Sequence, residues 1–315
     1  MTNEHSYLLG KYSELNREWG GRQAVAMGEV GSGKTTLLAY LMLAAVKGVS
    51  LNGESREKQA GIWRGRQSDR FPMFAKMAKT IVFIPKGRKL EVNLIHKDGG
   101  APEKTDLPGL GLEVVEFKRT DEIVESIRPG EISVVLSIYE PLKETELWSS
   151  VLHSLAVRRS AQWVNLAIDE AHNVFPPPTV ADYSMQTKAA ADKLDLRRAF
   201  TNCTMAVHSA KLLNWMMLTG LDWALYLKGA TKLRGSRVRQ NYISRLKQGE
   251  AHLDGGSGYV LFQFPDFKKE NKLPYELIIQ PEGEEGRNMR LTRAAAEKMA
   301  PEGPKLKKWE YGFYG

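Results

Sequence analysis

Two short segments carry residue types whose spacing points to phosphate chemistry. The first spans 28–36 and reads GEVGSGKTT, which matches the pattern G-x-x-x-x-G-K-[ST] in full. Glycines at this spacing let the main chain turn tightly, while loop N–H groups and the following helix present positive potential to a phosphate. The nucleotide is therefore expected to contact Gly28, Glu29, Val30, Gly31, Ser32, Gly33, Lys34, Thr35 and Thr36.

Three side chains in this segment have separate expected roles. Lys34 reaches the β- and γ-phosphates, and the Thr35 hydroxyl binds Mg²⁺. Thr36 stands one step further into the helix and contacts the α-phosphate. The expected ligands are thus ATP and Mg²⁺.

The second segment is an acidic pair, Asp169 and Glu170, directly after the apolar run WVNLAI at 163–168. Two carboxylates at the end of a buried strand are costly unless they are used, and ligands bind at that edge of an open α/β sheet. Asp169 is expected in the Mg²⁺ shell, and Glu170 is expected to orient and deprotonate the attacking water. The pair favours hydrolysis over switching.

His172 follows the acidic pair and precedes three prolines at 176–178. It either reports on the γ-phosphate or caps this loop, and we prefer the structural role. The chain has one cysteine, Cys203, in the apolar run CTMAV, where a core position is expected. With one cysteine and scattered histidines, the sequence shows no zinc-binding pattern.

The elements around these motifs alternate between strands and helices. Strands are expected at 22–27, 80–84, 90–95, 112–117, 131–138, 163–168, 203–207 and 223–227, and helices at 6–19, 34–46, 121–127, 144–159, 181–200 and 211–219. Such alternation implies right-handed crossovers and a mostly parallel sheet with helices on both faces. The expected fold is an α/β P-loop NTPase of the RecA-like (ASCE) kind.

Less regular segments complete the expected organisation. Residues 51–70 are polar and basic and are expected to form a loop with a helical piece, and 258–264 with 273–280 a late hairpin. One ATPase domain is expected over 1–281, with an exposed insertion at 97–111. The charged tail at 282–315 is expected to contact a subunit or partner.

The charge of the chain favours an anionic partner. The 315 residues carry a formal net charge of +8, which fits a phosphate backbone or an anionic membrane surface, although solubility alone is the alternative. The N-terminus lacks the features of a signal peptide, and no segment is apolar enough to span a membrane. A cytoplasmic location is therefore expected.

One stretch concentrates this charge. Residues 228–247 contain seven Lys or Arg, no acid and the interleaved Tyr242. Such a stretch can track a nucleic-acid backbone without reading bases, or it is a solvated helix face. The candidate DNA contacts are Lys232, Arg234, Arg237, Arg239 and Arg245. A second basic and aromatic loop, at 63–66 with Arg70, is a candidate pore loop or arginine finger.

The order of motifs resembles the FtsK/HerA superfamily of P-loop ATPases, which includes DNA pumps, conjugation and VirB4-type proteins, and viral genome-packaging motors. Four stretches carry the resemblance: GEVGSGKTT at 28, PGEISVVLSIY at 129, LAIDEAHNVFPP at 166 and RRAFTNCTMAVHS at 197. It covers 22–227 and shows no appended winged-helix domain, so the chain resembles a minimal motor core.

The resemblance also implies roles that the residues alone do not give. Arg197, with Arg198 as the alternative, would reach the ATP of a neighbouring subunit, and His208 or Ser209 would stand where the family has a Gln that senses the γ-phosphate. The usual Gly near the arginine is missing. The implied assembly is a ring-shaped homo-oligomer, a hexamer, that acts on DNA and docks on a viral procapsid or a secretion or conjugation machine.

Three functions remain open on the sequence. The first is a Mg-ATP-hydrolysing motor that translocates DNA. The second is an ATPase that powers protein secretion or virion extrusion. The third is a nucleotide-gated binding protein with little turnover, against which Glu170 argues.

Overall fold

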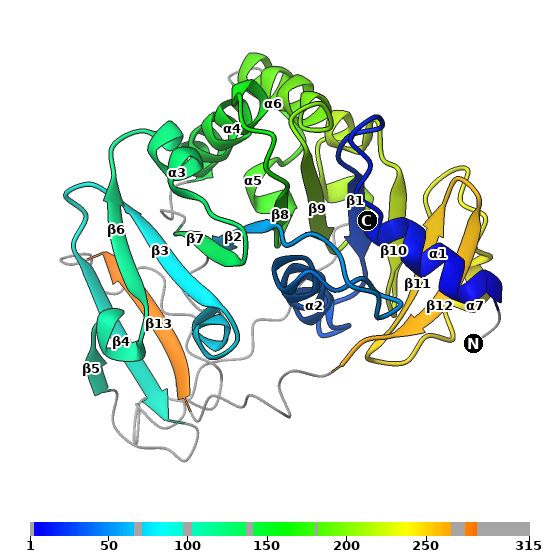
Figure 1. Ribbon diagram of the computed structural model, residues 1–315, viewed down its shortest axis with the longest axis horizontal. Coiled ribbons are helices and arrows are strands. Elements are labelled where there is room, and N and C mark those ends of the chain that lie inside the picture. Colours follow the sequence, from blue (N-terminus) through cyan, green and yellow to red (C-terminus); the bar gives the residue numbers. More distant parts are fainter. Residues whose placement is uncertain are drawn as a thin grey trace, which may run out of the picture.

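A ten-stranded sheet runs through the molecule in the order β12-β11-β10-β1-β9-β8-β2-β7-β3-β6 (Figure 1). The computed structural model describes residues 3–65, 71–96, 103–136, 141–179, 182–265 and 275–281. Eight strands are mutually parallel: β1 (Gln23–Met27), β2 (Ala60–Gly65), β3 (Lys79–Pro85), β6 (Glu113–Phe117), β7 (Glu131–Leu136), β8 (Val164–Ile168), β9 (Thr201–Val207) and β10 (Trp223–Tyr226). At one edge, β11 (Glu250–Gly255) and β12 (Gly258–Gln263) continue the sheet as an antiparallel hairpin.

Helices cover both faces of this sheet and close a separate core on each. α2 (Lys34–Lys47) and α1 (Asn3–Ser13) pack on one face, while α3 (Thr120–Ser126), α4 (Pro141–Val157) and α6 (Tyr183–Asp195) pack on the other (Figure 1). Since both faces are covered, β1, β2, β8, β9 and β10 are buried along their whole length. The predicted α/β fold with helices on both faces is confirmed.

Strand order decides where the motifs meet. β9 lies between β1, which leads into the glycine-rich segment, and β8, which leads into the acidic pair. All three strands run parallel, so their carboxyl ends reach the same edge of the sheet. The short helix α5 (Ala171–Val174) then carries the chain away from β8.

The prediction of a loop over 51–70 holds for 51–59 and is wrong for 60–65, which form the buried central strand β2. Its sequence, AGIWRG, lacks the usual pattern of a buried strand because it contains two glycines and an arginine. A Cβ at Gly61 would lie 2.6 Å from the Met42 sulfur, and one at Gly65 would lie 2.6 Å from a Val134 methyl. Close packing therefore requires these glycines.

The late part of the chain also pairs differently from the prediction. The strand at 258–264 pairs with β11 and not with 273–280, so the predicted hairpin partner is wrong. Instead β13 (Tyr275–Pro281) pairs with β4 (Leu90–His96) in a three-stranded antiparallel sheet that also contains β5 (Glu103–Thr105). The predicted exposed loop at 97–111 thus contains a short strand in its described part.

Smaller differences concern helices. The N-terminal helix ends at Ser13, well before the predicted end at 19. The predicted helix at 211–219 is two 3₁₀ turns, η3 (Ala210–Leu212) and η4 (Trp215–Leu218), and further short elements are η1 (Phe71–Lys76), η2 (Pro108–Leu110) and α7 (Gln240–Ile243). Among the described residues, no helix has the length and apolar character needed to cross a membrane. The tail at 282–315 lies outside the described residues.

A substitution at Gly21 tests how closely the chain before β1 packs against β9. A Cβ at this position would lie 2.0 Å from the main-chain oxygen of Thr201, so Gly21→Ala must push β1 and β9 apart. We expect a loss of about 2 kcal/mol or more in the free energy of unfolding, measured by urea denaturation. Gly256→Ala is the matched control, because nothing lies within 4 Å of its added Cβ. Equal stability of the two variants would contradict this packing.

Candidate active site

The segment between β1 and α2 has the conformation of a phosphate-binding loop. Gly31 and Gly33 have left-handed φ angles of 79° and 100°, which favour glycine. A Cβ at Gly28 would lie 2.5 Å from the Ser32 hydroxyl oxygen. The glycines in the pattern are thus required by the backbone path, and the loop ends where α2 begins at Lys34.

This loop leaves polar groups available for a ligand. Among the described residues, the amide N–H groups of Gly31 and Gly33 have no acceptor, and the buried Ser32 hydroxyl has no hydrogen-bond partner. The N-terminus of the fourteen-residue α2 adds positive potential at the same place. A buried hydroxyl such as that of Ser32 normally has a partner, and together with the two loop amides it fits a phosphate group.

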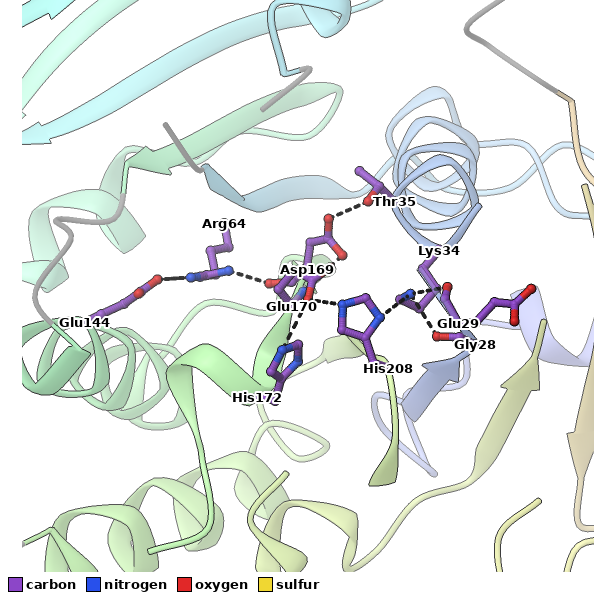
Figure 2. A network of polar contacts seen from close by, with 10 residues as sticks. All are labelled: Gly28, Glu29, Lys34, Thr35, Arg64, Glu144, Asp169, Glu170, His172 and His208. Carbon is purple, nitrogen blue, oxygen red and sulfur yellow. Dashed lines mark hydrogen bonds and ion pairs between the residues drawn. The ribbon is translucent and has the colours of Figure 1, made fainter. Parts of the chain in front are cut away.

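Thr35 and Asp169 connect the two motifs directly. The Thr35 hydroxyl donates to Asp169 Oδ2 at 2.6 Å (Figure 2). Asp169 is 3% exposed, and its other carboxylate oxygen accepts the N–H of Glu170 at 3.0 Å. A hydroxyl and a carboxylate oxygen are ligands that Mg²⁺ prefers, so this pair fits the predicted metal site.

Lys34 lies folded back over the loop. Its ammonium donates to the carbonyl oxygens of Gly28 and Glu29 and to His208 Nδ1, each at 2.9 Å (Figure 2). Burial lowers the pKa of Lys34, and the nearby carboxylates, Glu170 first, partly oppose this shift. An ammonium can only donate, so His208 Nδ1 accepts and the ring proton resides on Nε2.

Two histidines hold Glu170. His208 Nε2 lies 3.0 Å from Glu170 Oε2, and His172 Nε2 lies 3.3 Å from the same oxygen. Glu170 also has a left-handed backbone, with φ 49°, a conformation that costs a non-glycine residue roughly 1–3 kcal/mol and clusters at functional sites. Lys34, His208 and Glu170 therefore form one continuous polar chain across the end of the sheet (Figure 2).

Arg64 supports this edge from within the fold, which the sequence did not suggest. Arg64 is 2% exposed, and its guanidinium pairs with Glu144 from α4 and donates to the Asp169 carbonyl oxygen at 2.6 Å. The assignment of Arg64 to an exposed pore loop or arginine finger is therefore wrong, because its donors are already used inside the chain. Arg66 and Arg70 lie outside the described residues. No pattern in the sequence marks Glu144 as the partner.

Other candidate residues lie apart from this site. Arg197 precedes β9, at the amino ends of the parallel strands, and pairs with Asp222 at 3.1 Å. The Arg198 side chain is 90% exposed. Neither contacts the phosphate loop of its own chain, so a role toward a neighbouring subunit stays a prediction. Ser209 accepts the N–H of Lys211 as the cap of η3, whereas His208 enters the site.

The basic stretch forms a surface segment between β10 and β11. Lys232, Arg234, Arg237, Arg239 and Arg245 are all exposed. Within the part of the chain that the structure describes, none of the five has a carboxylate at ion-pair distance. Buried Val238, Ile243 and Leu246 anchor the segment. The segment therefore presents these five cations on the surface, and it is not a regular helix apart from the single turn α7.

The sheet and the loop define an α/β fold of the P-loop NTPase kind, and comparison with solved structures gives several similar folds. The genome packaging NTPase B204 from Sulfolobus turreted icosahedral virus 2, solved with ATP-gammaS, is 12% identical with a TM-score of 0.43, over 79% of this chain and 98% of that one. VirB4 of Thermoanaerobacter pseudethanolicus is 12% identical with a TM-score of 0.47, over 81% and 92%.

The N-terminal domain of zonular occludens toxin from Neisseria meningitidis is 12% identical with a TM-score of 0.33, over 80% of this chain and 98% of that one. No protein-family model matches the sequence, and no curated protein matches it either. The likeness concerns the fold alone.

Lys34→Ala tests the phosphate loop. We expect nucleotide affinity to fall about tenfold or more, because a charge-assisted contact worth roughly 1.5–3 kcal/mol is lost. The measurement is titration with a fluorescent ATP analogue. Lys47→Ala, at the exposed far end of the same helix, is the control and should bind as the parent does. Equal affinity of the two variants would place the nucleotide elsewhere.

Proposed function

We propose that this protein is a Mg-ATP hydrolase that works as a DNA-translocating motor. One observation carries the hydrolase: Thr35 meets Asp169 at 2.6 Å, and Lys34 reaches Glu170 through His208, all at one edge of the sheet. A phosphate loop, a metal pair and a carboxylate with an acceptor oxygen thus face the same space. Such a set fits hydrolysis better than binding alone.

The chain's own residues account for each step. Loop amides bind the β-phosphate, and Lys34 turns from His208 to the β- and γ-phosphate oxygens. Thr35 and Asp169 would hold Mg²⁺, which would supply positive charge beside the phosphates. Glu170 accepts the proton of the attacking water, and His208 stands where it can sense the γ-phosphate. ATP binding would therefore rearrange the polar chain of Lys34, His208 and Glu170.

Glu170→Gln separates binding from chemistry. The amide keeps the size of the side chain but cannot take a proton from water, so turnover should fall about 10²- to 10⁴-fold while ATP affinity is retained. Steady-state phosphate release and equilibrium nucleotide binding measure the two effects. An unchanged rate would support the reading of a nucleotide-gated binding protein instead.

The basic segment supports DNA as the substrate, and it is joined to the phosphate loop at both ends. The Lys228 carbonyl accepts the Glu29 N–H at 3.0 Å, and its ammonium pairs with the Glu29 carboxylate at 3.3 Å. At the other end, Gln248 donates to the Gly31 carbonyl at 3.2 Å. A change in the loop on nucleotide binding would thus reach the exposed arginines directly.

We further propose a ring-shaped homo-oligomer, a hexamer, acting in the cytoplasm. In such a ring Arg197 or Arg198 would contact the ATP of the neighbouring subunit, and the basic segments would line a central channel. The basic segment favours a DNA-translocating motor over a motor that exports proteins or extrudes virions. The turnover of such an export motor would not respond to DNA.

DNA dependence tests the substrate. ATPase activity should rise with double-stranded DNA at low salt, and the effect should weaken at higher salt because phosphate contacts release counterions. Alanine at Arg234, Arg237 and Arg239 together should lower the slope of log affinity against log salt by about 2–3, since each phosphate contact contributes about 0.9.

The matched control removes the same charge elsewhere. Alanine at the exposed Lys47, Lys118 and Lys188 should leave the salt slope of the parent. If DNA neither stimulates turnover nor binds at either salt concentration, the export motor becomes the better account. If both triple variants behave alike, the basic segment is not the contact surface.

A further inference from the structure

Three potential metal ligands converge beside the phosphate loop. Glu170 Oε2 lies 3.0 Å from His208 Nε2 and 3.3 Å from His172 Nε2, and the three residues' ligand atoms all lie within 4.8 Å of one another. The two histidines are separated in sequence and come together because the start of α5, which carries His172, lies beside the end of β9, directly before His208 (Figure 2). All three side chains are partly exposed, so an ion can reach them.

We propose that Glu170, His172 and His208 form a binding site for a zinc-class divalent cation, held through one carboxylate oxygen and two imidazole nitrogens. Two histidines and a glutamate are an established zinc donor set, with bonds of about 2.0–2.1 Å. In a tetrahedron with such bonds, ligand atoms are about 3.3 Å apart. The distances from Glu170 Oε2 to the two histidine Nε2 atoms, 3.0 and 3.3 Å, are already close to this ligand spacing. A water molecule would be the fourth ligand.

This site differs from the Mg²⁺ site in its chemistry. Thr35 and Asp169 offer oxygen atoms only, which suit Mg²⁺. Imidazole nitrogens select Zn²⁺ and similar transition metals, and Mg²⁺ binds them poorly. Excess Mg²⁺ should therefore not displace the cation from the histidine pair.

The surrounding structure holds the ligands in place before any ion binds. Ala171 and Val174 are fully buried and fix α5, which carries His172. The buried strand β9 delivers His208, and the N–H of Asn173 donates to the Glu170 carbonyl at 2.9 Å. Such preorganisation lowers the ordering cost of metal binding.

Lys34 links this site to nucleotide. The Lys34 ammonium donates to His208 Nδ1, which requires the ring proton on Nε2. A cation at Nε2 requires that proton on Nδ1 instead, where it would face the ammonium. Metal binding and the Lys34 contact thus exclude each other, with no net proton released by His208. A nucleotide that draws Lys34 to its phosphates should therefore strengthen metal binding.

The bound cation would also occupy the lone pair with which Glu170 accepts a proton. It should inhibit hydrolysis, and this consequence, like the effect of nucleotide on Lys34, rests on the proposed function. Binding itself depends only on the three side chains and is measured without turnover.

The test uses the untagged full chain and Zn²⁺ competed against a chromogenic chelator, in excess Mg²⁺ and without nucleotide. One Zn²⁺ per chain is expected, with affinity about tenfold or more lower in His172→Gln and in His208→Gln. His153→Gln is the control, because His153 pairs with Asp192 away from this edge. No preference of the parent over His172→Gln and His208→Gln, or an equal loss in the control, overturns the proposal.

A second measurement does not depend on variants. Co²⁺ added to the parent should give the intense visible absorption of a tetrahedral nitrogen and oxygen site, removed by Zn²⁺. A weak octahedral spectrum overturns the proposed geometry. Zn²⁺ binding with no ATPase activity would leave the metal site standing and remove the proposed function. ATPase activity with no Zn²⁺ binding would do the reverse.

Discussion

The candidate active site depends on the contact between Thr35 and Asp169, a 2.6 Å hydrogen bond that joins residues far apart in the sequence. Parallel strands are spaced about 4.8 Å apart, so one intervening strand places the ends of β1 and β8 about 10 Å from each other. That distance suits a phosphate group and its metal. β9 is the intervening strand, and His208 at its end spans the gap between Lys34 and Glu170.

A buried ion pair next to the edge of the sheet positions the residues of the site. Arg64 and Glu144 are both nearly inaccessible to solvent and form an ion pair, and the arginine also binds the Asp169 carbonyl. A buried pair contributes little net stability, yet removal of one partner leaves an uncompensated charge. In this protein the Arg64–Glu144 pair instead fixes the position of the turn at which Asp169 and Glu170 leave the sheet.

The sequence predicted the parts whose information is local. The glycine pattern and the acidic pair each occupy a few consecutive residues, and the structure brings them together as expected. β2 was missed because two glycines and an arginine interrupt its strand pattern. Tertiary contacts explain these residues: Gly61 packs against Met42, Gly65 packs against Val134, and Arg64 pairs with Glu144. The pairing of β13 with β4 was missed for a related reason: register between distant strands is set by tertiary contacts.

The edge of the sheet thus combines the glycine-rich loop, the Thr35–Asp169 pair and a carboxylate, Glu170, that two histidines contact. The most direct test of this claim is a crystal structure with a non-hydrolysable ATP analogue and Mn²⁺, with the metal located by its anomalous scattering. The account predicts a peak between Thr35 and Asp169, with Lys34 turned from His208 to the phosphates. A nucleotide bound elsewhere, or a metal remote from Asp169, would contradict it.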